Sequence, residues 1–140
     1  MTVFKNDIRF AAGRPAVTSM SGAQDAEIGA PLEYGGSAET LNPEELFVAS
    51  INSCLMLVFQ HFAEKSHVTI ESYEASAEAT VEKTRDGLRF TGVNVQARVQ
   101  AAVEVGDVVA RLQELAELAE KFCLVSNSVG CPVGYSVSAA

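Results

Sequence analysis

Basic residues are few in this sequence, and they are not clustered. The 140 residues include 10 Lys and Arg against 18 Asp and Glu, which gives a formal net charge of −8 at pH 7. Proteins that bind nucleic acid or anionic lipid use basic patches to neutralise phosphate groups. We therefore expect no nucleic acid and no membrane among the partners of this protein.

The sequence also lacks the motifs of several common enzyme chemistries. It has no glycine-rich phosphate loop, no serine nucleophile elbow, and neither a CxxC nor an HExxH motif. Its two histidines, His61 and His67, are six residues apart, a spacing that places them on different faces of a helix. We therefore expect no bound metal and no cofactor.

The first residues, MTVFKNDIRF, do not show the basic and apolar runs of a signal or transit peptide. The expected location is therefore the cytoplasm, where structural disulfides are uncommon. In that compartment the three cysteines, Cys54, Cys123 and Cys131, are expected to be buried thiols, metal ligands or redox-active groups.

Length and composition fit a single globular domain over residues 1–140. Hydrophobic residues make up 48% of the chain and charged residues 20%, so a sizeable core can form. Short strands are expected at Val3–Phe10 and Ala16–Met20, followed by a long loop. A central helix, a hairpin, a second helix and a terminal strand at Tyr135–Val137 follow, and this order indicates an α+β fold.

The central helix has the clearest local signal. Asn42 can cap it, Pro43 suits its first turn, and Glu45 stands three residues beyond the cap. From Leu46 to Phe59 the sequence is apolar almost all round, which predicts a helix buried on several sides. This run is shorter than the roughly 20 apolar residues that cross a membrane.

The second half of the chain predicts a hairpin and another helix. Apolar and polar residues alternate over Tyr73–Val81, which is typical of a half-buried strand. Thr84–Gly87 supplies turn residues, and the second strand changes phase at Gly92, as at a β-bulge. Asp107 is then expected to cap a helix that ends near Phe122.

Two cysteines are associated with the two predicted helices. A cysteine within an apolar helix, such as Cys54, is usually an inert packing residue, and the same interpretation applies to Cys123. If the helices pack together, however, the two thiols can approach and act as a nucleophile and its resolving partner. The spacing alone does not decide whether the two cysteines are inert packing residues or a reactive pair.

Three segments, taken together, point to one family. Asn42–Leu46 reads NPEEL, Cys54 follows within the same helix, and Cys123–Asn127 reads CLVSN after the second helix. In this combination the chain resembles the OsmC/Ohr family of thiol-dependent peroxidases over almost its whole length. The resemblance implies an antiparallel sheet packed on a buried central helix with a second helix, in an intertwined homodimer.

The resemblance also implies roles for individual residues. Cys54 would be the nucleophile that attacks an organic hydroperoxide, and Cys123 would resolve the product as an intramolecular disulfide. Glu44 would help to position an active-site arginine that favours the Cys54 thiolate. An external dithiol, which is a lipoylated protein in the family, would restore the reduced enzyme.

Two departures from the family pattern affect these roles. The better-studied members have proline directly after the resolving cysteine, where this chain has Leu124, so the local turn is expected to differ. No arginine occurs within Glu33–Leu41, which leaves Arg14 as a better candidate than Arg9 for the active site. Cys131 matches neither family cysteine and is expected to be a bystander.

The neighbours of Cys54 and the position of Glu44 give two further expectations. Apolar residues around Cys54 (Leu55, Met56, Val58 and Phe59) suggest a pocket for organic or fatty-acyl hydroperoxides. Glu44 lies ten residues before Cys54, about 15 Å along a straight helix, so a shared site would need either a break in the helix or Glu44 from a second chain. No Gly or Pro lies within Leu46–Phe59, which favours the second chain. The alternative is a non-enzymatic dimer that binds a small apolar ligand, with both cysteines as core thiols.

Overall fold

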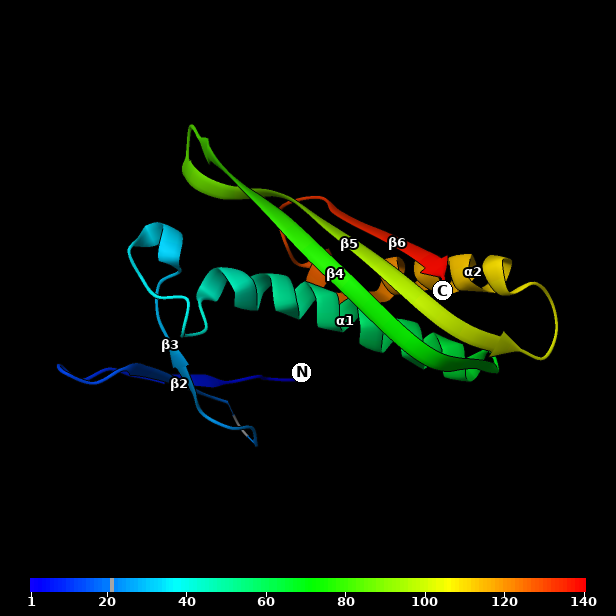
Figure 1. Ribbon diagram of the computed structural model, residues 1–140, viewed down its shortest axis with the longest axis horizontal. Helices are drawn as coiled ribbons and strands as arrows, with labels where there is room; N and C mark the ends of the chain where they lie inside the picture. The colour runs from blue at the N-terminus through cyan, green and yellow to red at the C-terminus, as the bar shows by residue number, and fades with distance from the viewer. Residues whose placement is uncertain (21) are drawn as a thin grey trace. The chain divides into compact units, whose positions relative to one another are not determined.

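A computed structural model describes residues 1–20 and 22–140 (Figure 1). The chain divides into two compact parts, here called the N-terminal part (Met1–Phe47) and the C-terminal part (Val48–Ala140). In chain order the elements are β1 (Asn6–Arg9), β2 (Ala16–Met20), β3 (Ala26–Ile28), the 3-10 helix η1 (Leu32–Tyr34), α1 (Pro43–Lys65), β4 (Val68–Thr84), β5 (Gly87–Val103), α2 (Val108–Phe122), α3 (Leu124–Asn127) and β6 (Val133–Ala139). The predicted mixture of strands and helices is therefore confirmed.

The N-terminal part contains a small antiparallel sheet in the order β1-β2-β3. The prediction for β2 is confirmed, whereas β1 is shorter than the predicted strand. The Asn6 side chain joins the first two strands by donating to Thr18 Oγ1 at 2.8 Å. The segment that we expected to be a long loop also forms β3 and η1. Neither element is apparent in the sequence pattern, because each is only three residues long.

The start of α1 agrees with its sequence signal. The Asn42 side-chain oxygen accepts a hydrogen bond from the Glu45 backbone N–H at 2.8 Å, as an N-cap residue does. Pro43 is the first helical residue, where the missing N–H has no cost. The helix then continues beyond Phe59 to Lys65.

The β4–β5 hairpin follows the predicted alternation closely. Its turn places Arg85 and Asp86 between the strands, and Gly87 has a φ of 99°, which favours glycine. The register shifts where Thr80 pairs with Gly92 and Val81 pairs with Phe90, which confirms the predicted bulge. The hairpin is therefore set by local sequence signals.

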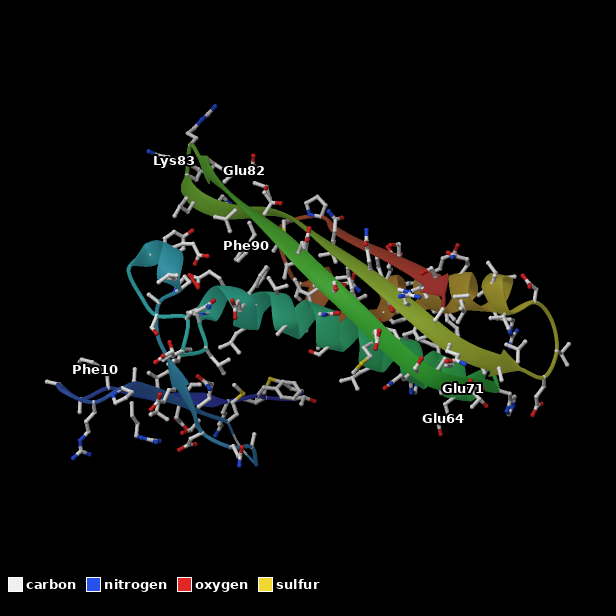
Figure 2. The ribbon with its side chains drawn as sticks, in the orientation of Figure 1. Phe10, Glu64, Glu71, Glu82, Lys83 and Phe90 are labelled. Carbon is white, nitrogen blue, oxygen red and sulfur yellow. The ribbon has the colours of Figure 1, made fainter. Side chains whose placement is uncertain are left out.

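Strand β6 gives the C-terminal sheet a feature that the sequence did not indicate. It pairs in parallel with Val93–Val99 of β5, so α2 is the crossover between two parallel strands. The turn end of the hairpin extends past this pairing, and Figure 2 labels Glu82 and Lys83 there. The sheet is thus mixed, in the order β4-β5-β6, rather than purely antiparallel.

One face of this sheet carries the core of the C-terminal part. Figure 1 shows α1 and α2 on the same side of β4, β5 and β6. Phe59 of α1 packs against the rings of Tyr73 and Tyr135, with centroid distances of 5.6 and 6.5 Å. The fully buried side chains of this part include those of Ile51, Leu55, Phe59, Leu112, Leu115, Val93, Val95 and Val99.

Within a single chain, helix α1 is buried along one stripe. Its buried residues are Ile51, Leu55, Phe59 and Ala63, which follow a helical period. Leu57, on another face, is 59% exposed. By length and apolar composition alone, this helix could cross a membrane, and core helices of soluble proteins share that property. Among the residues that the structure describes, α1 therefore keeps apolar surface exposed, with Leu57 as an example.

Candidate functional site

Cys54 lies in the middle of α1 and is half-buried. Its neighbours Leu55 and Phe59 are fully buried in the core, so they cannot line a pocket beside the thiol. Met56 and Val58 are only half-buried. This corrects the expectation that four apolar neighbours surround a substrate pocket, because helix geometry turns two of them toward the sheet.

Cys123 lies at the junction of α2 and α3 and is fully buried. Its backbone N–H donates to Ala119 O at 2.9 Å and so closes the last turn of α2. Its Sγ accepts a hydrogen bond from the Ser126 N–H at 3.4 Å and so caps α3. The Ser126 hydroxyl adds a bond to Cys123 O at 3.3 Å. The second thiol is thus part of the structure that joins two helices.

Cys123 is among the groups that act on the Cys54 thiol, so the two side chains lie near each other although they are far apart in the chain. Both cysteines are free thiols, as is Cys131. Burial raises the pKa of the Cys54 thiol, and Cys123 raises it further. The backbone N–H groups of Val125 and Leu124 act in the opposite direction, because they donate to the Cys54 sulfur. The balance favours the neutral thiol, contrary to the expectation of a lowered pKa.

A pair of tyrosines lies near this thiol pair. The hydroxyl oxygens of Tyr73 and Tyr135 are 2.6 Å apart and share a hydrogen bond. Burial raises the pKa of Tyr135 strongly, with further contributions from Tyr73, Glu120 and Cys123. Burial also raises the pKa of Tyr73. Both hydroxyls therefore stay protonated at neutral pH and serve as hydrogen-bonding groups.

The other predicted site residues belong to the N-terminal part. Oε2 of Glu44 is buried and has no hydrogen-bond partner among the residues that the structure describes. Arg14 is exposed, and its backbone N–H closes a turn to Ala11 O. Arg9 is paired with Asp25 at 3.0 Å on the surface. No ion pair joins Glu44 to either arginine within residues 1–20 and 22–47.

The remaining candidates are Cys131 and the two histidines, which lie in other segments of the chain. Cys131 is half-buried in the segment that leads into β6. His61 packs edge-on against Phe62, and His67 ends the α1 region with a φ of 56°. In the described chain, no group of three His, Cys, Asp or Glu side chains is placed to hold a metal ion.

Two parts of the site were not found from the sequence. The first is the pair of N–H donors at Leu124 and Val125, which leaves no trace in residue type because the main chain supplies it. The second is the tyrosine pair, whose members are 62 residues apart in the chain. The sequence does show one relevant difference at the residue after Cys123. Leu124 stands where better-studied family members have proline, and it keeps the backbone N–H that proline lacks.

Comparison with protein families decides the family of this chain. A family model described as OsmC-like protein matches residues 36–137. The chain belongs to the OsmC-like family. This match covers α1, both thiols and the whole C-terminal sheet apart from its last residues. A search of curated proteins gives no match.

Solved structures of OsmC-like proteins share the fold at low sequence identity. An OsmC-like protein of unknown function from Vibrio cholerae has a TM-score of 0.90 and 23% identity, covering 99% of this chain and 100% of its own. An organic hydroperoxide resistance protein from Elizabethkingia anophelis has a TM-score of 0.79 and 20% identity, covering 100% and 98%. The organic hydroperoxide resistance protein OhrB of Bacillus subtilis has a TM-score of 0.67 and 23% identity, covering 99% and 98%.

Proposed function

We propose that this OsmC-like protein reduces organic hydroperoxides, with Cys54 as the nucleophile and Cys123 as the resolving thiol. The observation that carries the proposal is the proximity of the two thiols, which come from distant parts of the chain and lie near enough for Cys123 to raise the pKa of Cys54. Similar structures include organic hydroperoxide resistance proteins, which supports the same class of substrate. We place the activity in the cytoplasm, where a dithiol reductant can restore the enzyme.

The proposed reaction has two steps in the protein. The Cys54 thiolate attacks one peroxide oxygen, the O–O bond breaks, and the other oxygen leaves with the electron pair and takes up a proton as an alcohol. Cys54 is thereby oxidised to a sulfenic acid. The Cys123 sulfur then attacks the Cys54 sulfur, a disulfide forms, and the sulfenic oxygen leaves as water. An external dithiol, such as a lipoylated protein, reduces this disulfide by thiol exchange.

Glu44 and Arg14 are proposed to complete the site. The buried Oε2 of Glu44 without a partner is a costly arrangement, which a guanidinium group would relieve. A positive charge near Cys54 would also offset the burial that raises the pKa of its thiol. Arg14 is our candidate for that cation, because Arg9 already pairs with Asp25.

We further propose an intertwined homodimer with paired α1 helices. The apolar surface of α1 that remains exposed, including Leu57, supports this assembly. Glu44 and Cys54 lie on one continuous helix, about 15 Å apart along its axis, so a site that uses both would take them from different chains. Two equivalent sites would then form at the interface.

The redox proposal is tested by mapping disulfides after treatment with one equivalent of cumene hydroperoxide. We expect a peptide pair that links Cys54 to Cys123, together with loss of one peroxide for each disulfide formed. Peroxide-treated Cys54→Ser is the control and should give no linked pair. A Cys131 linkage, or free thiols after the peroxide has been consumed, would contradict the mechanism.

The homodimer is tested by sedimentation equilibrium at micromolar concentration. We expect twice the chain mass of 14.8 kDa. Leu57→Glu should weaken association, because it places a charge on the exposed apolar face of α1, whereas Gln60→Glu, one turn along the helix at a polar position, serves as the control. A 14.8 kDa monomer that still reduces organic hydroperoxides would rule out the shared site.

Two observations favour the alternative, a non-enzymatic protein that binds a small apolar ligand. Burial raises the pKa of Cys54, which weakens the thiol as a nucleophile at neutral pH. The N-terminal part also contains a pocket of about 650 Å³, a size suited to a small ligand, with Phe4, Ile8, Met20, Ile28 and Leu46 in its lining. Ligand binding without any peroxide consumption would support this alternative.

A further inference from the structure

The N-terminal part contains a pocket of about 650 Å³ that the peroxidase proposal does not use, here called the N-terminal pocket. Its volume lies within the range of about 300 to 1,000 Å³ that is usual for small-molecule sites. Residues from the segment before β1, from all three strands of the small sheet and from the start of α1 line it. Most of these residues are apolar, namely Val3, Phe4, Ile8, Met20, Ile28 and Leu46.

Several of these apolar side chains are exposed to water. Phe4 is 84% exposed, Ile8 is 58% exposed and Met20 is 44% exposed. Transfer of such side chains out of water is favourable, and exposed apolar groups that gather in one place mark interaction sites. The N-terminal pocket therefore favours an occupant with an apolar body.

The charge of the pocket lining differs from that of the whole protein. The chain has 18 Asp and Glu against 10 Lys and Arg, yet the described lining residues include Lys5 and neither Asp nor Glu. Within residues 1–20 and 22–140, no ion pair engages the Lys5 ammonium group. A cation without a nearby carboxylate attracts an anion, so the lining favours a negatively charged group at one end of the occupant.

The hydrogen bonds of the lining leave a second donor for such a group. The Asn6 side-chain amide uses its N–H groups on Thr18 Oγ1 at 2.8 Å and on Ser19 O at 3.0 Å. Thr18 is only 3% exposed, and its hydroxyl keeps a proton for which the described residues provide no acceptor. A buried donor without an acceptor is costly. A carboxylate, which accepts several hydrogen bonds, is suited to both the Thr18 hydroxyl and the Lys5 ammonium group.

We propose that the N-terminal pocket binds an alkyl carboxylate, with the chain against the apolar side chains and the carboxylate at Lys5 and Thr18. A neutral apolar molecule would leave both donors without an acceptor, and a cationic one would be repelled by Lys5. The inference gives this protein a ligand site that depends on neither thiol. It is therefore measurable without any peroxide.

The test is isothermal titration calorimetry with three probes that share one alkyl chain: decanoate, 1-decanol and decyltrimethylammonium. At pH 7.5 and low salt we expect decanoate to bind about threefold or more tightly than 1-decanol, and the cationic probe to bind most weakly. High salt should reduce the advantage of decanoate, because it screens the exposed Lys5. Equal affinities for decanoate and the cationic probe would overturn the inference.

Lys5→Met tests the recognition of the carboxylate. It removes the ammonium group but keeps a chain of similar length, so decanoate should lose its advantage while the affinity for 1-decanol stays the same. Lys83→Met, at the end of β4, is the matched control because it removes the same charge outside the pocket lining. An equal loss of decanoate affinity in the two variants would show that Lys5 does not contact the ligand.

Met20→Gln tests the position of the alkyl chain. A polar side chain of similar shape should weaken both decanoate and 1-decanol by about threefold or more. Unchanged affinities would place the binding elsewhere and refute the site. Failure of decanoate to bind would also refute it, and sedimentation equilibrium would then show whether a second copy of the chain covers the pocket instead. Peroxide turnover is measured separately, so decanoate binding without turnover would overturn the peroxidase proposal and support this inference.

Discussion

The middle of α1 and the junction of α2 with α3 each supply one thiol, but the two regions hold it differently. Cys54 is half-buried on a helix that exposes apolar surface. Cys123 is fully buried, and its sulfur caps the helix that follows it. One thiol is therefore partly exposed, whereas the other is buried and also caps α3. The comparison predicts different outcomes when each thiol is removed.

The largest effect is expected for Cys54→Ser. A serine hydroxyl is far less nucleophilic than a thiolate, so consumption of organic hydroperoxide should fall to the background rate of the buffer. Because this position is half-buried, the free energy of unfolding should change by about 1 kcal/mol or less. Peroxide assays measure the loss of turnover, and thermal unfolding measures the change in stability. Retained turnover would remove Cys54 from the mechanism.

Cys123→Ser should allow one turnover and then stop. The first peroxide still oxidises Cys54, but no thiol is present to form the disulfide, so the sulfenic acid accumulates. Trapping with dimedone and mass analysis should detect it at Cys54. Cys123→Ala should give the same chemistry and lose a further ~1 kcal/mol of stability relative to the serine variant, because alanine cannot cap α3. Sustained turnover in the serine variant would show that another group resolves Cys54.

A smaller effect is expected from pH. Burial and Cys123 raise the pKa of the Cys54 thiol, so the thiolate is a minor form at neutral pH. Below that pKa each added pH unit increases the thiolate fraction about tenfold. The rate of sulfenic acid formation in single-turnover assays should therefore rise steadily from pH 6 to 8. A flat profile would show that a cation such as Arg14 holds the pKa of Cys54 low.

The smallest effect is expected for Cys131→Ser. This thiol is half-buried ahead of β6 and is not one of the groups that act on Cys54. Peroxide turnover and disulfide yield should match those of the unmodified protein. A loss equal to that of Cys123→Ser would show that Cys131 takes part in resolution, and our assignment of it as a bystander would be wrong.

Features that depend on residues close together in the sequence, such as helix caps and the β-bulge, were predicted correctly. Asn42 and Asp107 cap the two long helices as expected, with N–H to oxygen distances of 2.8 and 3.1 Å. The bulge at Gly92 was also predicted correctly, because the phase of alternating residues reveals it. Each of these features depends on residues within a few positions of one another.

Features that depend on distant residues were missed or mistaken. The parallel pairing of β5 with β6 could not be read from either strand alone. The apolar sequence of α1 did not show which of its sides packs within the chain and which stays exposed there. The N–H donors at the Cys54 thiol come from the main chain, so no residue type signals them. The spacing of Cys54 and Cys123 left open whether the thiols approach each other, because that depends on how the two helices pack.

The crossover that pairs β6 with β5 also bears on how the reactive pair arises during synthesis. A ribosome delivers Cys54 well before Cys123. Contacts between residues so distant in sequence form late, and parallel pairing is slow because a long loop must close first. If the two cysteines act as proposed, a nascent chain under oxidative conditions would carry its nucleophile for a time without the resolving thiol. Molecules oxidised in that interval would be exposed to irreversible sulfinic acid formation before they are complete.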